Sequence, residues 1–431
     1  MARVAVIGGG LAGLAAAAAL GDSGHQVDVY EMRPYFGGRA ASYPLPGTEG
    51  EHIDNCQHIL LGCCVNLLDF YRRLGVQDRI RFHREFYFLE PGGRLSTLKL
   101  GRLPAPAHFA SSFLKLNFLG WRDKSAIVRA MLAIRRERLV RTDLDRITML
   151  EWLHAKRQTP DAIDRFWRQV LVSALNEELD RIAAIHGFQV FWLGFLSGSR
   201  NAEMGIPAVP LGELYSAEAW SGRPNVRLHP RTTVDRIRFD NGRATGLDAD
   251  HYISAVPFEK LEALAPELGL DLTGFTHSPI TGIHLWFDRP VTALPHATLL
   301  DRTIQWFFNK DDGRYLMVVV SASRSLVGME RKSLIDLAVQ ELGGFLPEVR
   351  NAALTKAHVV KEVRATFSAA PGLETRRPAT KTGFPNLFLA GDWTRSGWPA
   401  TMEGAVRSGY LAAEAVNEAE GRAERFLLTP Q

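Results

Sequence analysis

The sequence predicts an α/β fold, because a short buried strand, a glycine cluster and an alanine-rich helix follow one another at the start of the chain. Residues 4–7 (Val-Ala-Val-Ile) have the composition of a buried parallel strand, and the helix continues through Leu20. A second strand at 26–30 ends in Glu31, and a strand at 386–389 leads into Gly391-Asp392 near the other end of the chain. This order of elements is typical of a Rossmann-like domain.

The glycine cluster has the spacing of a dinucleotide-binding turn. Gly8 permits the tight turn, Gly10 lets the backbone approach a pyrophosphate, and Gly13 lets the helix pack closely on the strand. The helix N-terminus then faces the phosphate charge. Glu31, eighteen residues beyond Gly13, is placed to accept hydrogen bonds from an unphosphorylated ribose. A plain glycine-rich turn would leave Glu31 unexplained.

The residues after Glu31 separate a flavin site from a nicotinamide site. Arg33 and the run Gly37-Gly38-Arg39 follow, and nicotinamide-binding domains do not usually carry this run. The segment resembles the extended N-terminal motif of the amine oxidase and phytoene desaturase superfamily of flavoproteins, whose paired glycines and arginine contact the pyrophosphate and ribityl region. The resemblance implies that the cofactor is FAD, with Ala12, Met32, Gly38 and Arg39 among its contacts.

The C-terminal segment resembles the second flavin-contact region of the same superfamily. Asp392 is expected to bind the ribityl chain, next to Gly391. Residues 398–405 lead into a helix whose first amides, around Met402 and Ala405, are expected to face the flavin N1 and O2 edge. An ordinary helix start after a proline is the alternative. No Cys or His lies where monoamine oxidases carry a covalent flavin link, so the FAD is expected to bind non-covalently.

Two further segments define the domains. Residues 226–239 are predicted to form a strand hairpin resembling the superfamily segment that holds the adenine, which indicates Val234; a plain strand is the alternative. The superfamily architecture is a Rossmann-like FAD-binding domain with a discontinuous substrate domain of mixed sheet and helical cap. We assign 1–60, 200–256 and 376–431 to the FAD-binding domain, and 61–199 and 257–375 to the substrate domain. Within the latter, 65–200 is predicted to be mostly helical and 275–325 to form strands.

Composition excludes several other classes. The 431 residues, 46% hydrophobic and 23% charged, suit two or three globular domains. With 51 basic and 47 acidic residues, nucleic-acid binding is not predicted. Three cysteines within nine residues indicate no disulfide framework and a cytoplasmic protein, and with His52 and His58 they match no zinc pattern, so no metal is expected. The uncharged run 4–21 is interrupted by glycines, so no transmembrane helix is predicted.

Residues 102–141 are predicted to dock on a membrane. The first half is rich in apolar residues expected to be exposed: Phe109, Phe113, Leu114, Leu116, Phe118, Leu119 and Trp121. The second half, 122–141, has seven basic and two acidic residues, a net charge of 7 − 2 = +5. Helical spacing places Ile127, Met131 and Ile134 on one face and three arginines on another. We expect peripheral attachment to the anionic inner face of the membrane. An ordinary cap helix is the alternative.

The substrate is indicated by a second, narrower resemblance. Residues 54–63 (Asp-Asn-Cys-Gln-His-Ile-Leu-Leu-Gly-Cys), Phe166-Trp167 and 173–176 (Ser-Ala-Leu-Asn) resemble the squalene-associated branch of the superfamily, the hydroxysqualene dehydroxylases of the hopanoid pathway. Cys56 departs from the glycine of that pattern. The resemblance implies an isoprenoid substrate, contact with neighbouring squalene-pathway enzymes, and an apolar tunnel lined by aromatic residues of 102–121 and 188–196. Packing in the core is the alternative for any of these aromatic residues.

The same resemblance places the catalytic loop at 54–58. Reductive removal of a hydroxyl group needs a proton donor, and we expect His58 to be this acid, oriented by Asp54, with Gln57 nearby. A structural histidine and a turn cap are the alternatives. The rival functions are a carotenoid-type desaturase; an amine oxidase, for which no aromatic cage or lysine is identified; and a flavin-free prenyl escort protein. The glycine and acidic residues of the two flavin segments disfavour the escort protein. The oligomeric state stays open.

Overall fold

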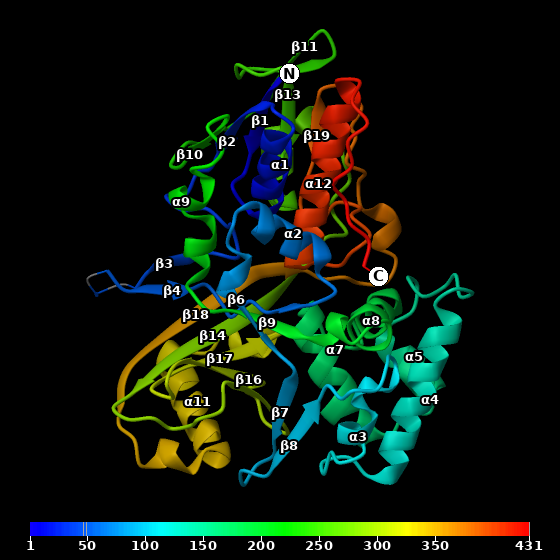
Figure 1. Cartoon of the computed structure of the whole chain (residues 1–431), viewed down its shortest axis with the longest axis vertical. Coiled ribbons are helices and arrows are strands. Elements are labelled where there is room, and N and C mark those ends of the chain that lie inside the picture. Colours follow the sequence, from blue (N-terminus) through cyan, green and yellow to red (C-terminus); the bar gives the residue numbers. More distant parts are fainter. Residues whose placement is uncertain (46, 49, 431) are drawn as a thin grey trace.

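A five-stranded parallel sheet forms the core of the first domain in the computed structural model, which describes residues 1–45, 47, 48 and 50–430 (Figure 1). Its strands, in spatial order, are β10 (Val226–His229), β2 (Gln26–Tyr30), β1 (Arg3–Ile7), β13 (His251–Ser254) and β19 (Leu387–Leu389). All five pair in parallel. The sheet therefore combines the two ends of the chain with a middle segment, and each strand lies inside one of the three ranges assigned to this domain.

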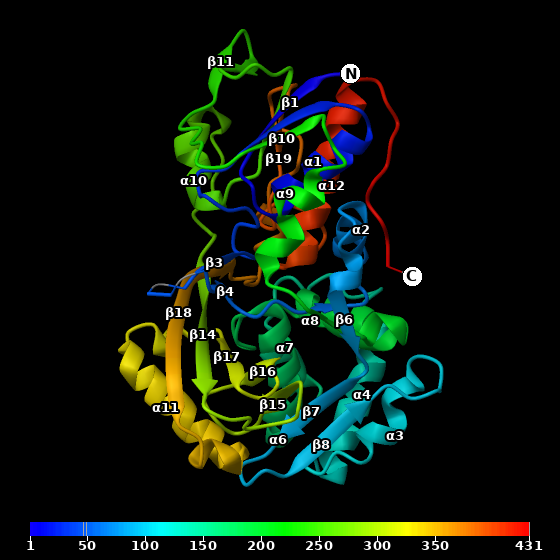
Figure 2. The same cartoon turned by 60° about the vertical axis from the view of Figure 1, so that its left-hand side comes forward.

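Two helices of small residues bring the chain ends together. Helices α1 (Leu11–Asp22) and α12 (Met402–Ala419) lie side by side in Figures 1 and 2. Their backbones approach so closely that a Cβ on Gly409 would lie 2.2 Å from the Ala12 carbonyl oxygen. The Ala12 backbone thus lies in the contact between the two helices, and a contact of Ala12 with the cofactor stays a prediction.

The predicted hairpin at 226–239 is wrong. Strand β10 pairs with β2 at the edge of the parallel sheet, whereas Arg238–Asp240 (β11) pairs with Arg243–Thr245 (β12). The turn that joins β11 to β12 is Asn241-Gly242, and both residues have positive φ, +48° and +72°. The sequence signal of the true hairpin is therefore this Asn-Gly pair, which lies just beyond the predicted segment.

The second domain is built on a seven-stranded mixed sheet (Figure 2). Its strands, in spatial order, are β18 (Leu354–Phe367), β14 (His277–Phe287), β17 (Tyr315–Ser321), β16 (Trp306–Asp311), β15 (His296–Leu299), β7 (Glu85–Leu89) and β8 (Leu95–Lys99). Four of these strands fill the range 275–325. The segment 65–200 is mostly helical, as predicted, but it also contains the hairpin of β7 and β8, which the prediction did not include. Its buried residues alternate along β8, at Ser96 and Leu98, which is the period of a strand.

Short strands and helices connect and cover the two sheets. The remaining strands are β3 (Ser42–Pro44), β4 (His52–Asp54), β5 (Leu60–Leu61), β6 (Ile80–His83) and β9 (Met204–Pro207). The remaining helices are α2 (Val65–Arg73), α3 (Ala110–Phe113), α4 (Trp121–Glu137), α5 (Met149–Ala155), α6 (Pro160–Ala162), α7 (Arg168–Leu175), α8 (Ala184–Phe191), α9 (Ala217–Trp220), α10 (Phe258–Leu264) and α11 (Arg331–Phe345). None of the described helices has the length and apolar composition needed to span a bilayer.

The first domain extends beyond the predicted boundary at residue 60. Helix α2 packs against α12, and Leu67 and Phe70 are buried in the core of the first domain. The carboxylate of Glu403, in the first turn of α12, accepts hydrogen bonds from the backbone amides of Asn66 (3.2 Å) and Leu67 (2.7 Å). Burial raises the pKa of Glu403. One buried side chain thus satisfies two free donors at the N-terminus of α2.

Asn176 joins the helical cap to the second sheet. It ends α7 in the left-handed conformation, with φ of +51°. Its amide nitrogen donates to the Ser278 carbonyl (2.9 Å) and the Thr366 hydroxyl (3.0 Å), and its oxygen accepts from the Ala322 amide (2.7 Å). The Ser-Ala-Leu-Asn motif is therefore explained in this fold by helix termination and satisfied hydrogen bonds.

The predicted assignment of faces in 102–141 is wrong. Ile127 and Ile134 are buried at 1% and 0% exposure, and Leu116, Phe118 and Leu119 are buried as well. Helix α4 thus turns this face toward the protein core. The prediction failed here because helical periodicity identifies an apolar face but does not show whether protein or lipid covers it. Other apolar residues of the segment, among them Leu114 and Trp121, remain exposed.

We expect Gly409→Ala to lower the free energy of unfolding by about 1–3 kcal/mol, because the added methyl group must push α12 away from α1. The control is Gly344→Ala in α11, where an added Cβ meets no atom within 4 Å. Urea denaturation measures both variants. Equal stabilities would contradict the close packing of the two helices.

Candidate active site

The opening turn has the geometry that a phosphate-binding loop requires. Gly8 has φ of +111°, and a Cβ there would lie 2.7 Å from the Ala255 carbonyl oxygen. A Cβ on Gly13 would lie 2.0 Å from the Gly8 carbonyl oxygen. Both positions therefore exclude side chains for backbone reasons, as the glycine spacing predicts. Gly10 precedes α1 as its N-cap, so the free amides of that helix start at the turn.

Glu31 binds the opening turn through both carboxylate oxygens. One oxygen accepts from the Gly9 amide and the other from the Arg33 amide, each at 2.8 Å. A carboxylate has about four acceptor sites, so two remain for ribose hydroxyl groups. Met32 lies next to it with 62% of its surface exposed. Glu31 thus shapes the turn in addition to the ribose contact predicted from the sequence.

The second glycine pair closes on the first. Gly37 forms a parallel bridge with Gly10, and its amide donates to the Gly9 carbonyl at 2.9 Å. Gly38 has φ of +64°, and a Cβ there would lie 3.0 Å from the Gly10 Cα. The two glycine segments therefore pack backbone to backbone, and side chains at either position would fill the space beside the turn.

An ion pair connects this turn to the far end of the chain. Arg39 donates from one guanidinium nitrogen to Asp392 Oδ1 (2.6 Å) and from another to the Ala365 carbonyl (2.9 Å). Asp392 is 5% exposed and follows Gly391, whose φ of +141° turns the chain after β19. The sequence segments predicted to share one cofactor site are thus in direct contact.

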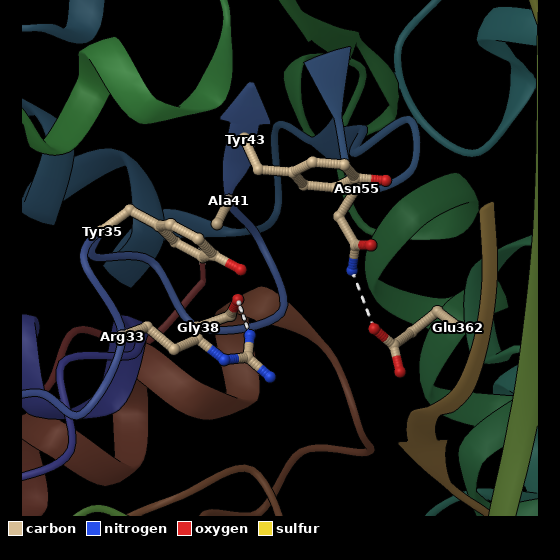
Figure 3. A pocket seen from close by; sticks show the side chains of 7 residues that line it. All are labelled: Arg33, Tyr35, Gly38, Ala41, Tyr43, Asn55 and Glu362. Atoms are coloured by element: carbon tan, nitrogen blue, oxygen red, sulfur yellow. Dashed lines mark hydrogen bonds between the residues drawn. The ribbon is translucent and has the colours of Figure 1, made fainter. Parts of the chain in front are cut away.

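A polar cavity of about 290 Å³ lies beside these segments (Figure 3). Its lining residues are Arg33, Tyr35, Gly38, Ala41, Tyr43, Asn55 and Glu362. Asn55 donates to Glu362 on β18 (3.1 Å) and to the Arg39 carbonyl (3.1 Å), so both domains contribute to the wall. Glycines without room for side chains, a helix N-terminus and an adjoining polar cavity fit the pyrophosphate and ribityl parts of FAD.

The start of α12 supplies a second helix N-terminus. The Thr401 hydroxyl caps the helix by accepting from the Gly404 amide at 3.1 Å. Met402 is the first helical residue, and Ala405 follows one turn later with its amide bonded to the Thr401 carbonyl. Because the Gly404 and Ala405 amides are bonded within this first turn, the contact of Met402 and Ala405 with the flavin edge stays a prediction.

Val234 lies between β10 and β11, outside regular structure. The Thr232 amide donates to the Glu31 carbonyl at 2.9 Å, which brings this segment beside the end of β2. Val234 itself is partly buried against the cluster that contains Ile7 and Ile237. The adenine contact at Val234 stays a prediction.

The predicted catalytic loop contacts a lysine that the sequence did not indicate. Lys310, on β16, places Nζ 3.4 Å from Asp54 Oδ2 and 3.2 Å from Gln57 Oε1. Asp54 Oδ1 accepts from the Ser42 hydroxyl (2.7 Å) and the Leu211 amide (2.9 Å). Lys310 lies more than 250 residues beyond the loop in an ordinary strand, so only the folded sheet brings them together.

The predicted pairing of His58 with Asp54 is wrong. His58 Nδ1 lies 2.8 Å from the Cys56 carbonyl, whereas Asp54 is engaged by Ser42, Leu211 and Lys310. Burial lowers the pKa of His58, so the ring is neutral at neutral pH. Since a neutral ring that donates from Nδ1 accepts at Nε2, His58 is an acceptor in the resting protein and a poor proton donor.

The aromatic residues of 188–196 pack against one another. Phe191 lies 4.5 Å from Trp167 and 5.4 Å from Phe195, measured between ring centroids. Phe188 contacts Trp152 at 4.8 Å. These rings belong to the main buried cluster of the second domain, which favours the core alternative over the tunnel lining predicted for them.

We expect Arg39→Met to weaken FAD binding about tenfold or more, because Asp392 would remain buried without its cation. Flavin fluorescence during titration of the apoprotein measures this loss. The control is Arg227→Met, which removes a more exposed ion pair with Asp28 in the same domain. Equal affinities in the two variants would contradict the assigned role of the Arg39–Asp392 pair.

Comparison with known proteins agrees with this geometry. The family model "Flavin containing amine oxidoreductase" matches residues 11–417. A 15-cis-phytoene desaturase of Synechococcus elongatus is 26% identical over 96% of this chain and 95% of its own length. A zeta-carotene desaturase of Synechocystis is 24% identical over the whole of both chains.

Solved structures share the fold. Putrescine oxidase bound to putrescine superposes with a TM-score of 0.70 at 15% identity, over 97% of this chain and 99% of its own. An oxidoreductase from Methanosarcina mazei has a TM-score of 0.71 at 20% identity, over 96% of this chain and all of its own. The family match over most of the chain and the cradle formed by its two ends lead to one conclusion: this chain is an FAD-dependent oxidoreductase and belongs to the flavin-containing amine oxidoreductase family.

Proposed function

We propose that this enzyme acts on a long isoprenoid lipid and reduces hydroxysqualene to squalene. The reaction joins a hydride and a proton to the substrate's C–OH group: the hydride forms the new C–H bond, and the proton leaves with the hydroxyl group as water. Bound reduced FAD supplies the hydride and its two electrons. The protein must supply the proton at the departing oxygen.

The observation that carries this proposal is the contact of the Lys310 cation, on β16, with the loop at 54–58. The Lys310 ammonium group donates only, and Asp54 and Gln57 hold it at 3.4 Å and 3.2 Å. A held donor of this kind can protonate a leaving hydroxyl group. Asp54 stays in place because Ser42 and Leu211 engage its other oxygen. The resemblance of residues 54–63 to hydroxysqualene dehydroxylases supports the same reaction.

Carotenoid-type desaturation is the second candidate, and the similar proteins support it more directly than they support dehydroxylation. Among them are desaturases that carry the names of phytoene and zeta-carotene. Desaturation removes a hydride to oxidised flavin and a proton to a base, and an electron acceptor must then reoxidise the flavin. The neutral ring of His58, with Nδ1 beside the Cys56 carbonyl, can accept this proton at Nε2. Lys310 favours the first reaction, and His58 favours the second.

Two incubations distinguish these reactions. Under anaerobic conditions, the enzyme with reduced FAD and hydroxysqualene is expected to form squalene and oxidised FAD, which chromatography and flavin absorbance detect. In the second incubation, the enzyme receives oxidised FAD, phytoene and a quinone. A desaturated product there, with no squalene in the first, would replace dehydroxylation by desaturation.

We expect Lys310→Met to lower kcat about 100-fold or more, because proton donation to the hydroxyl group is lost. Lys310→Arg should be nearly as slow, since a guanidinium keeps the charge but holds its proton at neutral pH. Both variants should bind FAD like the unaltered enzyme. Lys356→Met, which removes an exposed ion pair with Glu51, is the control. Full activity of Lys310→Met would exclude Lys310 as the acid.

A further inference from the structure

The outer face of α4 is an exposed apolar stripe. Trp121, Val128, Leu132, Leu139 and Val140 are 46% to 74% exposed, although each is a large apolar residue. The first three recur at helical spacing, and the last two continue the stripe just beyond the end of α4. The opposite face of the same helix is buried in the core, at Ile127 and Ile134. The exposed stripe is therefore additional to what the helix needs for folding.

Cations border this stripe along its whole length. Arg122, Arg129 and Arg136 follow one another at intervals of seven residues on the outer side of the helix, and all three are exposed. Arg135 lies between the apolar positions. Among the residues that the structure describes, none of the four forms an ion pair with an acidic side chain. By contrast, Glu137, an acidic residue of this helix, is engaged by Lys156 and Arg141.

The stripe continues onto the segment before α4. Lys124 Nζ donates to the Leu114 carbonyl (2.8 Å) and lies 5.3 Å from the centre of the Trp121 ring, so exposed Leu114 and Trp121 lie close together. Lys115 and Arg102, in the same segment, line a cavity of about 800 Å³ between this segment and strands β6 to β8. Leu114 thus adjoins Lys115, a basic residue in the wall of this cavity.

We propose that this face, formed by the outer side of α4 and by Leu114, docks the enzyme on an anionic lipid bilayer. An exposed apolar stripe bordered by arginines without acidic partners matches a bilayer surface, where acyl chains lie beneath anionic headgroups. The proposal extends the proposed function, because a substrate of about thirty carbons stays in the membrane rather than in water. Figures 1 and 2 place α4 in the second domain, at the opposite end of the molecule from β11.

Vesicle sedimentation with the FAD-loaded enzyme tests the docking face. The vesicles contain phosphatidylcholine alone or mixed with phosphatidylglycerol. We expect binding to the mixed vesicles, and a loss of about tenfold or more in Arg122→Glu/Arg129→Glu/Arg136→Glu, since each arginine near an anionic surface adds to binding. The matched control is Arg238→Glu/Arg243→Glu/Lys260→Glu, which makes the same change of net charge at exposed positions of β11, β12 and α10.

A second measurement tests the apolar stripe. Brominated phosphatidylcholine in the mixed vesicles quenches tryptophans that enter the acyl region, and we expect Trp121→Phe to remove most of this quenching. The proposal would be overturned if the arginine reversals left vesicle binding at the wild-type level. It would also be overturned if the control reversals reduced binding equally. Absence of tryptophan quenching would also overturn the proposal. A dimer in solution that the arginine reversals dissociate would instead assign this face to contact with a second copy of the chain.

These outcomes are independent of the reaction. FAD content and turnover of detergent-solubilised substrate should be the same in the reversal variant, its control and the unaltered enzyme. If vesicle binding follows the prediction while neither hydroxysqualene nor phytoene is converted, the docking face stands and the proposed reaction fails. If conversion occurs without vesicle binding, the reaction stands and the docking face fails.

Discussion

The ion pair between Arg39 and Asp392 is the contact on which the site depends. It joins residues 353 positions apart in the chain, one just after the second glycine pair and the other just after strand β19 of the parallel sheet. Asp392 is buried, so its charge needs a partner in the folded protein. Helices α1 and α12 approach closely enough to hold the two segments in register. The cofactor site therefore depends on the packing of α1 against α12 and on the ion pair between Arg39 and Asp392.

The predicted catalytic loop has a proton donor and a proton acceptor close to it. Lys310 reaches it from the second domain, and His58 belongs to the loop itself. Asn55, in the same loop as His58, donates to both the Arg39 carbonyl and Glu362. The loop thus connects the cofactor cradle to the sheet of the second domain.

Features set by local backbone geometry could be predicted from the sequence. The glycines at 8 and 13 exclude side chains in the structure, and Gly391-Asp392 follows a strand as expected. Features that depend on residues distant in the sequence could not be predicted in this way. Lys310 is one residue of an alternating strand, with nothing local to distinguish it. The resemblance of residues 54–63 predicts that Asp54 orients His58, but the structure bonds His58 to the Cys56 carbonyl and Asp54 to Ser42, Leu211 and Lys310. The face of α4 was misassigned because its amphipathic pattern has two apolar sides.

The order of strands in the parallel sheet has a consequence for biosynthesis. Strands β1 and β2 are synthesised well before β13, which can pair with β1 only after residues 61–199 of the second domain have been made, and β19 and α12 follow later still. During translation the nascent N-terminal strand–helix unit lacks its neighbours, and its apolar surface is exposed. A complete flavin site therefore exists only after β19, Asp392 and α12 have been made, so removal of α12 should leave an apoprotein that is a target for chaperones and proteases.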